Sequence, residues 1–178
     1  MKIDIVKVGE LECNCYILEI DNNVLVIDPG DEVNKIIDKI GNREVVGIII
    51  THYHFDHIGA LDELKNKYNV SVYDKNNMKE GNNKINKFNF EVIYTPGHKE
   101  DCITIYFIED KCMFCGDFLF RDNIGRCDLP GGNIKEMIKS IEKIKKYDRD
   151  VLIYPGHGDK TTLGYEINNN YFFNSDMM

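Results

Sequence analysis

The stretch THYHFDH, residues 51–57, places three of the five histidines of this 178-residue chain within six positions. It directly follows the apolar run VVGIII, residues 45–50, which predicts a strand buried on both faces. In an extended segment His52 and His54 point to the same side, because side chains two positions apart share a face. The Asp-His pair 56–57 falls at the start of the next expected helix and can face a second point. The stretch therefore predicts a cluster of imidazole and carboxylate groups at a strand end.

The remaining histidines and one aspartate also stand where a predicted strand ends. His98 lies in TPGH after a strand ending at Tyr94, and His157 lies in PGHG after a strand ending at Tyr154. Asp117, in CGD, follows another strand, and each of the three sits next to a glycine. Strand ends on a rigid sheet can hold side chains that converge on one place. The joint pattern favours one shared site over five unrelated histidines.

Imidazole and carboxylate groups together suit zinc, iron or manganese. The candidate ligands are His52, His54, Asp56, His57, His98, Asp117 and His157. One metal ion cannot use seven ligands. Two ions that share one carboxylate can, with three terminal ligands each and Asp117 between them.

The pattern of the other segments predicts two groups of strands, each closed by helices. Strands are expected at 3–8, 15–20, 24–28, 45–50, 70–73, 88–95, 102–109, 111–116 and 150–156, and helices at 31–41, 58–68, 131–147 and from 161 onward. Asn133 is expected to cap the third helix, with Glu136 as its capping-box partner. Two packed sheets with helices outside fit this order, in one domain spanning 1–178.

The Asn- and Lys-rich stretch 74–87 predicts a solvated surface loop, for which a plain insertion is a simpler interpretation than a lid. The start of the chain shows no secretory signal and no apolar run long enough to span a membrane, so we expect a cytoplasmic protein. Its six cysteines are then expected to be free thiols, not a zinc ribbon. The net charge of −8 disfavours a nucleic-acid partner.

The motifs THYHFDH, TPGH, GD and PGHG resemble those of the metallo-β-lactamase superfamily, and the similarity extends from NCYIL (14–18) and VIDPGD (26–31) to the tail. The resemblance implies an α+β fold, a four-layer αββα sandwich of two mixed β-sheets with helices on both outer faces. It implies two divalent metals, zinc first, with iron or manganese as alternatives. The implied ligands are His52, His54 and His98 for the first metal and Asp56, His57 and His157 for the second, with Asp117 bridging.

Within the superfamily, the segments 116–132 and 155–166 are most similar to small glyoxalase II-like hydrolases. That similarity implies hydrolysis of a small-molecule thioester, such as an S-2-hydroxyacylglutathione, or a related acyl ester by a hydroxide bridging the metals. Asp56 would act as ligand and proton acceptor, and Arg126 is a candidate for binding a substrate anion. Full-length glyoxalase II enzymes carry a further helical domain that helps hold glutathione, so the thiol stays open, as does the oligomeric state.

Two other activities remain open at this point. A persulfide dioxygenase with one iron would use His52, His98 and Asp117, and that branch also has a stretch like GRCD, residues 125–128. A lactonase would use the same metal pair. Asp28 is expected to be a turn residue that can also accept a hydrogen bond from a ligand histidine.

Overall fold

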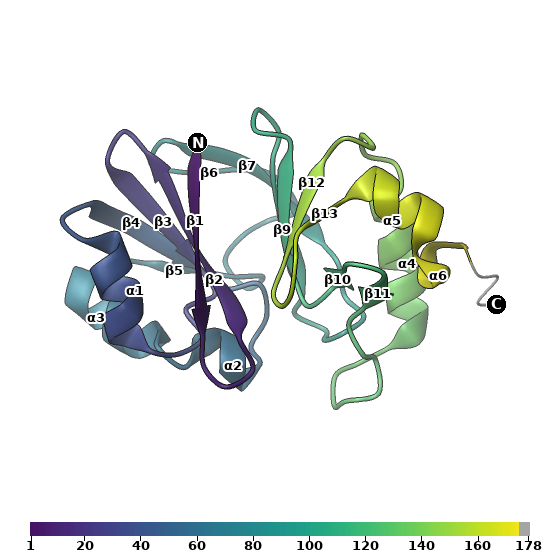
Figure 1. The fold of residues 1–178 in the computed structure, drawn as a ribbon, viewed down its shortest axis with the longest axis horizontal. Coiled ribbons are helices and arrows are strands. Elements are labelled where there is room, and N and C mark those ends of the chain that lie inside the picture. Colours follow the sequence, from purple (N-terminus) through teal and green to yellow (C-terminus); the bar gives the residue numbers. More distant parts are fainter. Residues whose placement is uncertain (175–178) are drawn as a thin grey trace.

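The computed structural model describes residues 1–174 and places two mixed sheets face to face, with helices on both outer faces (Figure 1). The first sheet has the order β1-β2-β3-β4-β5, with strands Lys2–Val8, Cys13–Ile20, Asn23–Ile27, Glu44–Ile49 and Val72–Tyr73. The second has the order β13-β12-β9-β8-β7-β6, with strands Thr161–Thr162, Leu152–Pro155, Cys112–Gly116, Ile103–Phe107, Phe88–Tyr94 and Gly81–Ile85. The predicted four-layer architecture is confirmed.

The helices form the two outer layers. On the side of the first sheet lie α1 (Val33–Ile40) and α3 (Leu61–Tyr68), and on the side of the second lie α4 (Ile134–Ile144), α5 (Leu163–Asn169) and α6 (Tyr171–Asn174) (Figure 1). Within residues 1–174, none of these helices combines the length and the apolar character that crossing a membrane requires. A small ribbon of β10 (Leu119–Phe120) and β11 (Asn123–Ile124) stands apart from both sheets.

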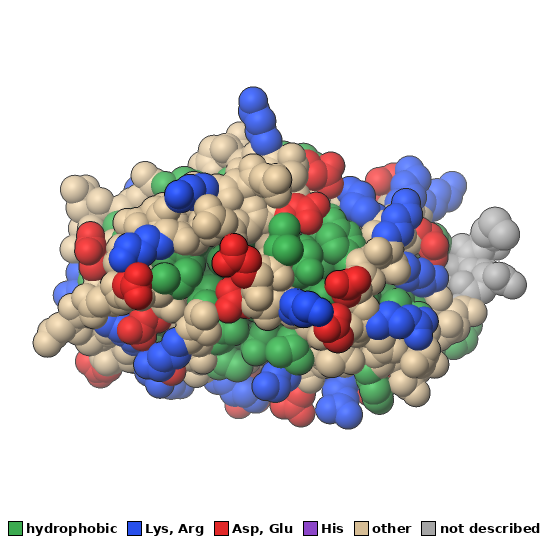
Figure 2. Space-filling view, turned by 90° about the horizontal axis from the view of Figure 1, so that it is seen from above, with side chains coloured by type: hydrophobic (Ala, Val, Ile, Leu, Met, Phe, Trp, Pro, Cys, Tyr) green, Lys and Arg blue, Asp and Glu red, His purple; other side chains and the backbone are tan. Residues whose placement is uncertain are grey.

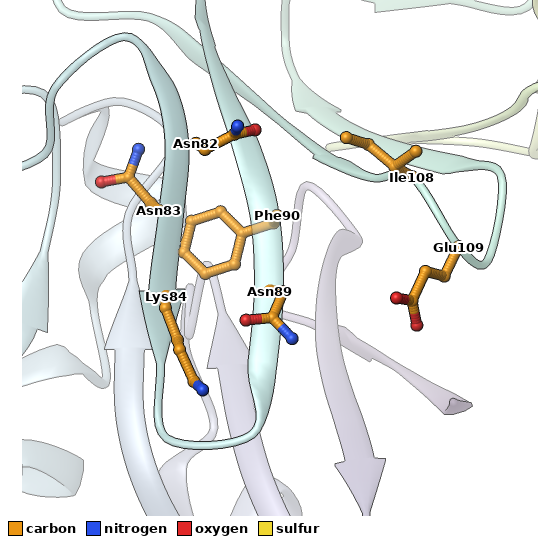
Figure 3. A pocket seen from close by; sticks show the side chains of 7 residues that line it. All are labelled: Asn82, Asn83, Lys84, Asn89, Phe90, Ile108 and Glu109. Atoms are coloured by element: carbon orange, nitrogen blue, oxygen red, sulfur yellow. The ribbon is translucent and has the colours of Figure 1, made fainter.

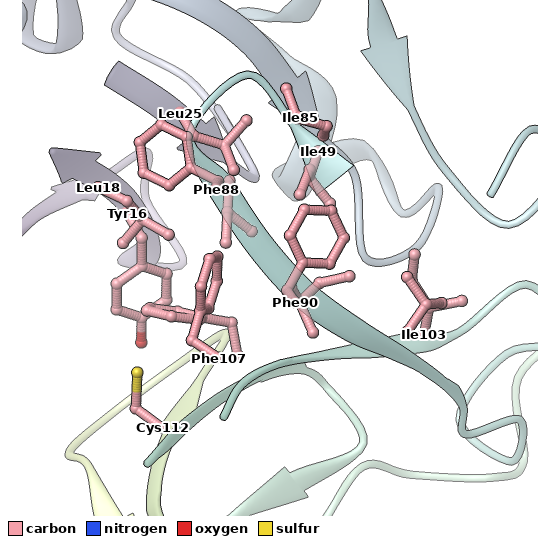
Figure 4. Packing of buried hydrophobic residues seen from close by; sticks show 14 of the residues in the cluster. Tyr16, Leu18, Leu25, Ile49, Ile85, Phe88, Phe90, Ile103, Phe107 and Cys112 are labelled. Atoms are coloured by element: carbon pink, nitrogen blue, oxygen red, sulfur yellow. The ribbon is translucent and has the colours of Figure 1, made fainter. Parts of the chain in front are cut away.

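The core between the sheets is rich in aromatic side chains (Figure 4). Phe88 and Phe107 of the second sheet are fully buried and face Leu18 and Leu25 of the first. Tyr16 also lies in this core, and its hydroxyl donates to the carbonyl oxygen of Pro155 at 2.5 Å. Since that bond joins β2 to the end of β12, it links the sheets close to the His157 loop.

The prediction of a loop over 74–87 is wrong for its second half. Strand β6 occupies Gly81–Ile85 and pairs antiparallel with β7, with Ile85 opposite Phe88. Because β6 is an edge strand, its polar side chains can face solvent while its backbone bonds to β7. Asn and Lys in such a strand hide the alternation that would reveal it.

The helix expected over 58–68 is divided. The chain first forms the short helix α2 (Phe55–Ile58), and α3 begins at Leu61. Gly59 separates them and donates its N–H to the carbonyl oxygen of Gly30 at 2.8 Å. A Cβ on Gly59 would lie 2.3 Å from that same oxygen, so this crossing requires glycine. The contact couples residues far apart in sequence, which local periodicity cannot reveal.

At the N-terminus of α4, the predicted Asn133 cap forms but the side chain of its capping-box partner does not take part. The side chain of Asn133 accepts hydrogen bonds from the backbone N–H groups of Lys135 and Glu136. The reciprocal bond of the capping box does not form, because the N–H of Asn133 donates to the carbonyl oxygen of Gly97 at 2.7 Å. This tertiary bond ties α4 to the turn that carries His98.

The loops that carry the histidines gather at the end of the sandwich where α2 lies, at the lower edge of Figure 1. Figure 2 views the opposite end, and no histidine of the described residues is visible on that face. All six cysteines, which lie within the described residues, are free thiols, as expected. Cys13, Cys15, Cys112 and Cys115 are buried in strands β2 and β9, where small apolar side chains pack.

Candidate metal centre

The first half of the centre joins three imidazoles from two loops. The Nε2 atom of His52 lies 3.1 Å from Nδ1 of His54, and the Nε2 atom of His98 lies 2.8 Å from that same Nδ1. His52 and His98 are buried, and His54 is half-buried. Three nitrogens that face one point from two segments form a ready set of ligands for a cation.

The second half combines two imidazoles with two carboxylates. Nε2 of His57 lies 3.3 Å from Oδ1 of Asp117, and Nε2 of His157 lies 3.1 Å from Oδ2 of Asp56. Asp117 also reaches the first half, since its Oδ2 lies 3.7 Å from Nε2 of His98. The structure thus brings all seven predicted side chains together, with Asp117 between the two halves.

Four of the five rings are held in place through the nitrogen that faces away from the centre. The Nδ1 partners are Thr51 Oγ1 for His52 (3.2 Å), Asp28 Oδ2 for His57 (2.9 Å), the carbonyl oxygen of Arg126 for His98 (2.8 Å) and the carbonyl oxygen of Leu11 for His157 (2.9 Å). A carboxylate or carbonyl acceptor fixes the proton on Nδ1 and leaves the Nε2 lone pair directed into the centre. This is the arrangement that metal-binding histidines require.

Unpaired buried atoms provide a separate test of whether the residues fit a metal. Among residues 1–174, four buried side-chain atoms have no hydrogen-bond partner, and two of them, His57 Nε2 and Asp117 Oδ1, lie in the centre, 3.3 Å apart. Leaving such groups unpaired is costly, particularly for a carboxylate. Donor atoms of His52, His57 and Asp117 lie within 4.8 Å of one another, as do those of the three-histidine half. A divalent cation would satisfy both orphaned atoms, so the residues fit the group.

The electrostatics of the two halves differ. Burial lowers the pKa of His52 well below its usual value, and burial also lowers the pKa of His54. Burial likewise opposes protonation of His57 and His157, but their carboxylate neighbours outweigh it. Asp28 and Asp117 raise the pKa of His57 well above its usual value, and Asp56 raises that of His157. His52 and His54 therefore offer neutral imidazoles, whereas His57 and His157 must lose protons to bind a metal.

Asp28 lies beneath both halves, as a turn residue with φ of 51° and almost no exposed surface. Its Oδ1 accepts the backbone N–H of Thr51 at 2.8 Å, and its Oδ2 accepts the Thr51 hydroxyl at 2.6 Å and the Nδ1 proton of His57. The expected hydrogen bond to a candidate ligand histidine is present. One carboxylate therefore orients the residue before His52 and the ring of His57.

Two glycines allow the backbone to approach the ligands closely. A Cβ on Gly156 would lie 2.2 Å from Oδ1 of Asp117 and 2.7 Å from Cε1 of His57. A Cβ on Gly116, which has φ of +50°, would lie 2.3 Å from the Thr51 hydroxyl. The glycines that precede Asp117 and His157 are therefore required by space.

The guanidinium of Arg126 is paired with the carboxylate of Asp128. Its Nε and Nη2 atoms each donate to a carboxylate oxygen of Asp128 at 2.8 Å, and both side chains are largely exposed. The part of Arg126 that contacts the centre is its carbonyl oxygen, which accepts from His98. In the same way, the carbonyl oxygen of Leu11 accepts a hydrogen bond from His157.

A cavity of about 580 Å³ opens beside Asp56, between the β1–β2 turn and α2. Two large apolar side chains line it, Leu11 and Phe55, which are 55% and 76% exposed. Exposed apolar groups around a concave surface are typical of a ligand-binding site. A second cavity of about 620 Å³ borders the segment after His157 and is lined in part by Lys7 and Lys160.

A further cavity of about 490 Å³ lies far from this chemistry (Figure 3). The side chains of the β6–β7 hairpin and of Ile108 and Glu109 line it. None of the seven candidate ligands lines it, so this cavity is not part of the centre.

With five histidines and two aspartates converging on one end of an αββα sandwich, the chain has the features of a metal-binding enzyme fold. The model of the metallo-beta-lactamase superfamily matches residues 8–74 and 83–157, and the chain belongs to that superfamily.

Three similar proteins illustrate the range of the superfamily. The chain is 31% identical to the hydroxyacylglutathione hydrolase GloC of Haemophilus influenzae, over 98% of this chain and 99% of the relative. The crystal structure of the BLEG-1 B3 metallo-beta-lactamase has a TM-score of 0.94 at 27% identity and covers 98% of this chain and 100% of its own. The crystal structure of TTHA1623 in a di-iron-bound form has a TM-score of 0.87 at 30% identity. The match covers 95% of this chain and 99% of TTHA1623.

Proposed function

We propose that this chain is a dinuclear metal-dependent hydrolase that cleaves a thioester, or a related acyl ester, of a small molecule. The observation that carries the proposal is the division of the seven donors into two sets that share Asp117. His52, His54 and His98 would hold one divalent metal, and Asp56, His57 and His157 the other. Zinc suits these ligands best, and the di-iron form of TTHA1623 supports iron as an alternative.

When bound, two divalent ions lower the pKa of water toward neutrality and polarise a carbonyl oxygen. The protein's own part in the reaction is to hold ligands, accept a proton and bind the substrate. Burial alone would raise the pKa of Asp56, but the hydrogen bond from His157 and the charge of His57 lower it overall. Asp56 is therefore ionised at neutral pH, so one of its carboxylate oxygens would hold the metal and the other could accept a proton. A thiolate leaves readily, so no separate strong acid is required.

The cavity lined by Asp56 and the cavity that borders Gly158 support a substrate with two unlike parts. Leu11 and Phe55 offer an apolar wall for the acyl group next to Asp56. Lys7 and Lys160, with Arg121, line the cavity beyond His157 and suit an anionic thiol. The name of the Haemophilus influenzae relative supports a glutathione thioester as the first substrate to test.

The test is an activity screen with metal quantified in the same sample. Purified protein is assayed on glutathione thioesters, coenzyme A thioesters, lactones and persulfides, with Asp117→Ala as the inactive control. We expect thioester hydrolysis with two metals per chain, and loss of activity and of at least one metal in the variant. One iron per chain with oxygen uptake on a persulfide would instead establish the dioxygenase alternative.

A further inference from the structure

Tyr53 stands between two histidines of the first half-site and is held at both ends. Its backbone N–H donates to Oδ2 of Asp101 at 3.0 Å, and its hydroxyl donates to Oδ2 of Asp74 at 2.6 Å. Asp74 is buried, so the hydroxyl bond reaches into the protein. The peptide that joins His52 to His54 is therefore fixed from outside the metal centre.

Asp101 belongs to the turn that carries His98. In this turn the N–H groups of Gly97 and Cys102 both donate to the carbonyl oxygen of Lys99, and Thr95 N–H donates to the carbonyl oxygen of Cys102. The ammonium of Lys99 contacts Oδ2 of Asp101 at 3.0 Å, and both side chains are about four-fifths buried, with 22% and 20% exposed. Oδ2 of Asp101 thus accepts from the Tyr53 N–H in the loop of His52 and His54, and from the Lys99 ammonium in the loop of His98.

This position matters because the three-histidine half is assembled from those two loops. The closest contact between the loops within the centre is the 2.8 Å approach of His98 Nε2 to His54 Nδ1. Rotation or displacement of the peptide at Tyr53 would move both neighbouring imidazoles relative to His98. The other half of the centre has different anchors, Asp28 for His57 and the carbonyl oxygen of Leu11 for His157.

We infer that Asp101 is a positioning residue for the three-histidine half of the metal centre. Its carboxylate holds the Tyr53 peptide against the Lys99 turn, so that His52, His54 and His98 converge, and it does not act on the half formed by the other ligands. The inference rests on the proposed ligand sets. Asp101 would contact no metal itself, and its positioning role would be specific to one of the two metals.

The test is a titration of metal-free protein with Co²⁺, followed by calorimetry and by the visible absorption of the bound ion. Asp101→Ala should weaken one of two binding events by up to about tenfold, the low end of the effect of losing a direct hydrogen-bond partner of a ligand, because Asp101 acts through the Tyr53 peptide. The other event should be weakened far less, because His57 and His157 have separate anchors. Asp101→Asn keeps an oxygen for the Tyr53 N–H and should recover most of the lost affinity.

Asp150→Ala is the matched control, since Asp150 also pairs with a lysine, Lys111 at 2.6 Å, but is exposed and distant from the histidine loops. It should leave both binding events unchanged. Equal weakening of both events by Asp101→Ala, or wild-type binding in that variant, would overturn the inference. Binding of a single Co²⁺ by the wild-type chain would instead contradict the dinuclear proposal, so the two failures are distinguishable.

Discussion

Replacing Asp28 by asparagine removes a negative charge from beneath the histidine cluster and keeps the size of the side chain. The carboxylate accepts three hydrogen bonds, from the Thr51 N–H, the Thr51 hydroxyl and His57 Nδ1, and it is 1% exposed. If the amide oxygen stays with the Thr51 N–H, the amide NH₂ faces the other two donors. The hydroxyl can rotate to accept, but a His57 ring protonated on Nδ1 cannot.

Two responses of His57 are then available, and both impair metal binding. A ring that keeps its Nδ1 proton leaves a buried donor unsatisfied, which costs about 1–3 kcal/mol. At about 2–4 °C per kcal/mol for a chain of this size, the Tm of the metal-free protein falls by about 2–12 °C. A ring that moves its proton to Nε2 keeps the stability but directs an N–H into the centre. A ring that keeps its Nδ1 proton still loses the carboxylate that makes its Nε2 a stronger donor to a metal. In either case the affinity of the half-site containing His57 should fall by about 10–100-fold.

The assay is a zinc competition titration with a chromogenic chelator, paired with thermal unfolding of the metal-free protein. Asp31→Asn is the control, because Asp31 is an exposed residue of the same loop. Wild-type zinc affinity in Asp28→Asn would refute the reasoning that the outer hydrogen bond sets the tautomer of His57.

Three further outcomes are expected. Gly156→Ala should fold but retain less than one metal per chain after dialysis, because its Cβ would lie 2.2 Å from Asp117 Oδ1; a full metal content would show that the backbone yields. Metal affinity should fall as the pH is lowered from about 8 to about 5.5, because the raised pKa values of His57 and His157 make protons compete with the metal. The fall should reach up to about tenfold per pH unit for each proton displaced, and an affinity that does not change with pH would contradict this. Phe55→Ala should raise KM more for a long apolar acyl thioester than for an acetyl one, by about 0.8 kcal/mol for each CH₂ that loses its contact, whereas an equal effect on both would remove Phe55 from the acyl site.

The sequence was sufficient to predict that the seven candidate side chains converge. Each of them stands where a predicted strand ends, so His98, Asp117 and His157 could be expected to approach the 51–57 stretch. Asp28 could be singled out because a carboxylate in a turn near a strand end is a recognisable feature.

The outer partners were harder to predict because they have no signature. The carbonyl oxygens of Leu11 and Arg126 hold two histidines, and every residue has such an oxygen. Asp101 looks like an ordinary loop residue until the fold brings it to Tyr53. The same limit explains the missed break at Gly59, where the decisive contact comes from Gly30.

The most direct test of the dinuclear centre is to titrate metal-free protein with Zn²⁺ and follow thioester hydrolysis against the number of ions bound. The shared position of Asp117 between the two half-sites predicts that activity rises to a plateau at two ions per chain. Full activity at one ion per chain, unchanged by a second, would contradict it.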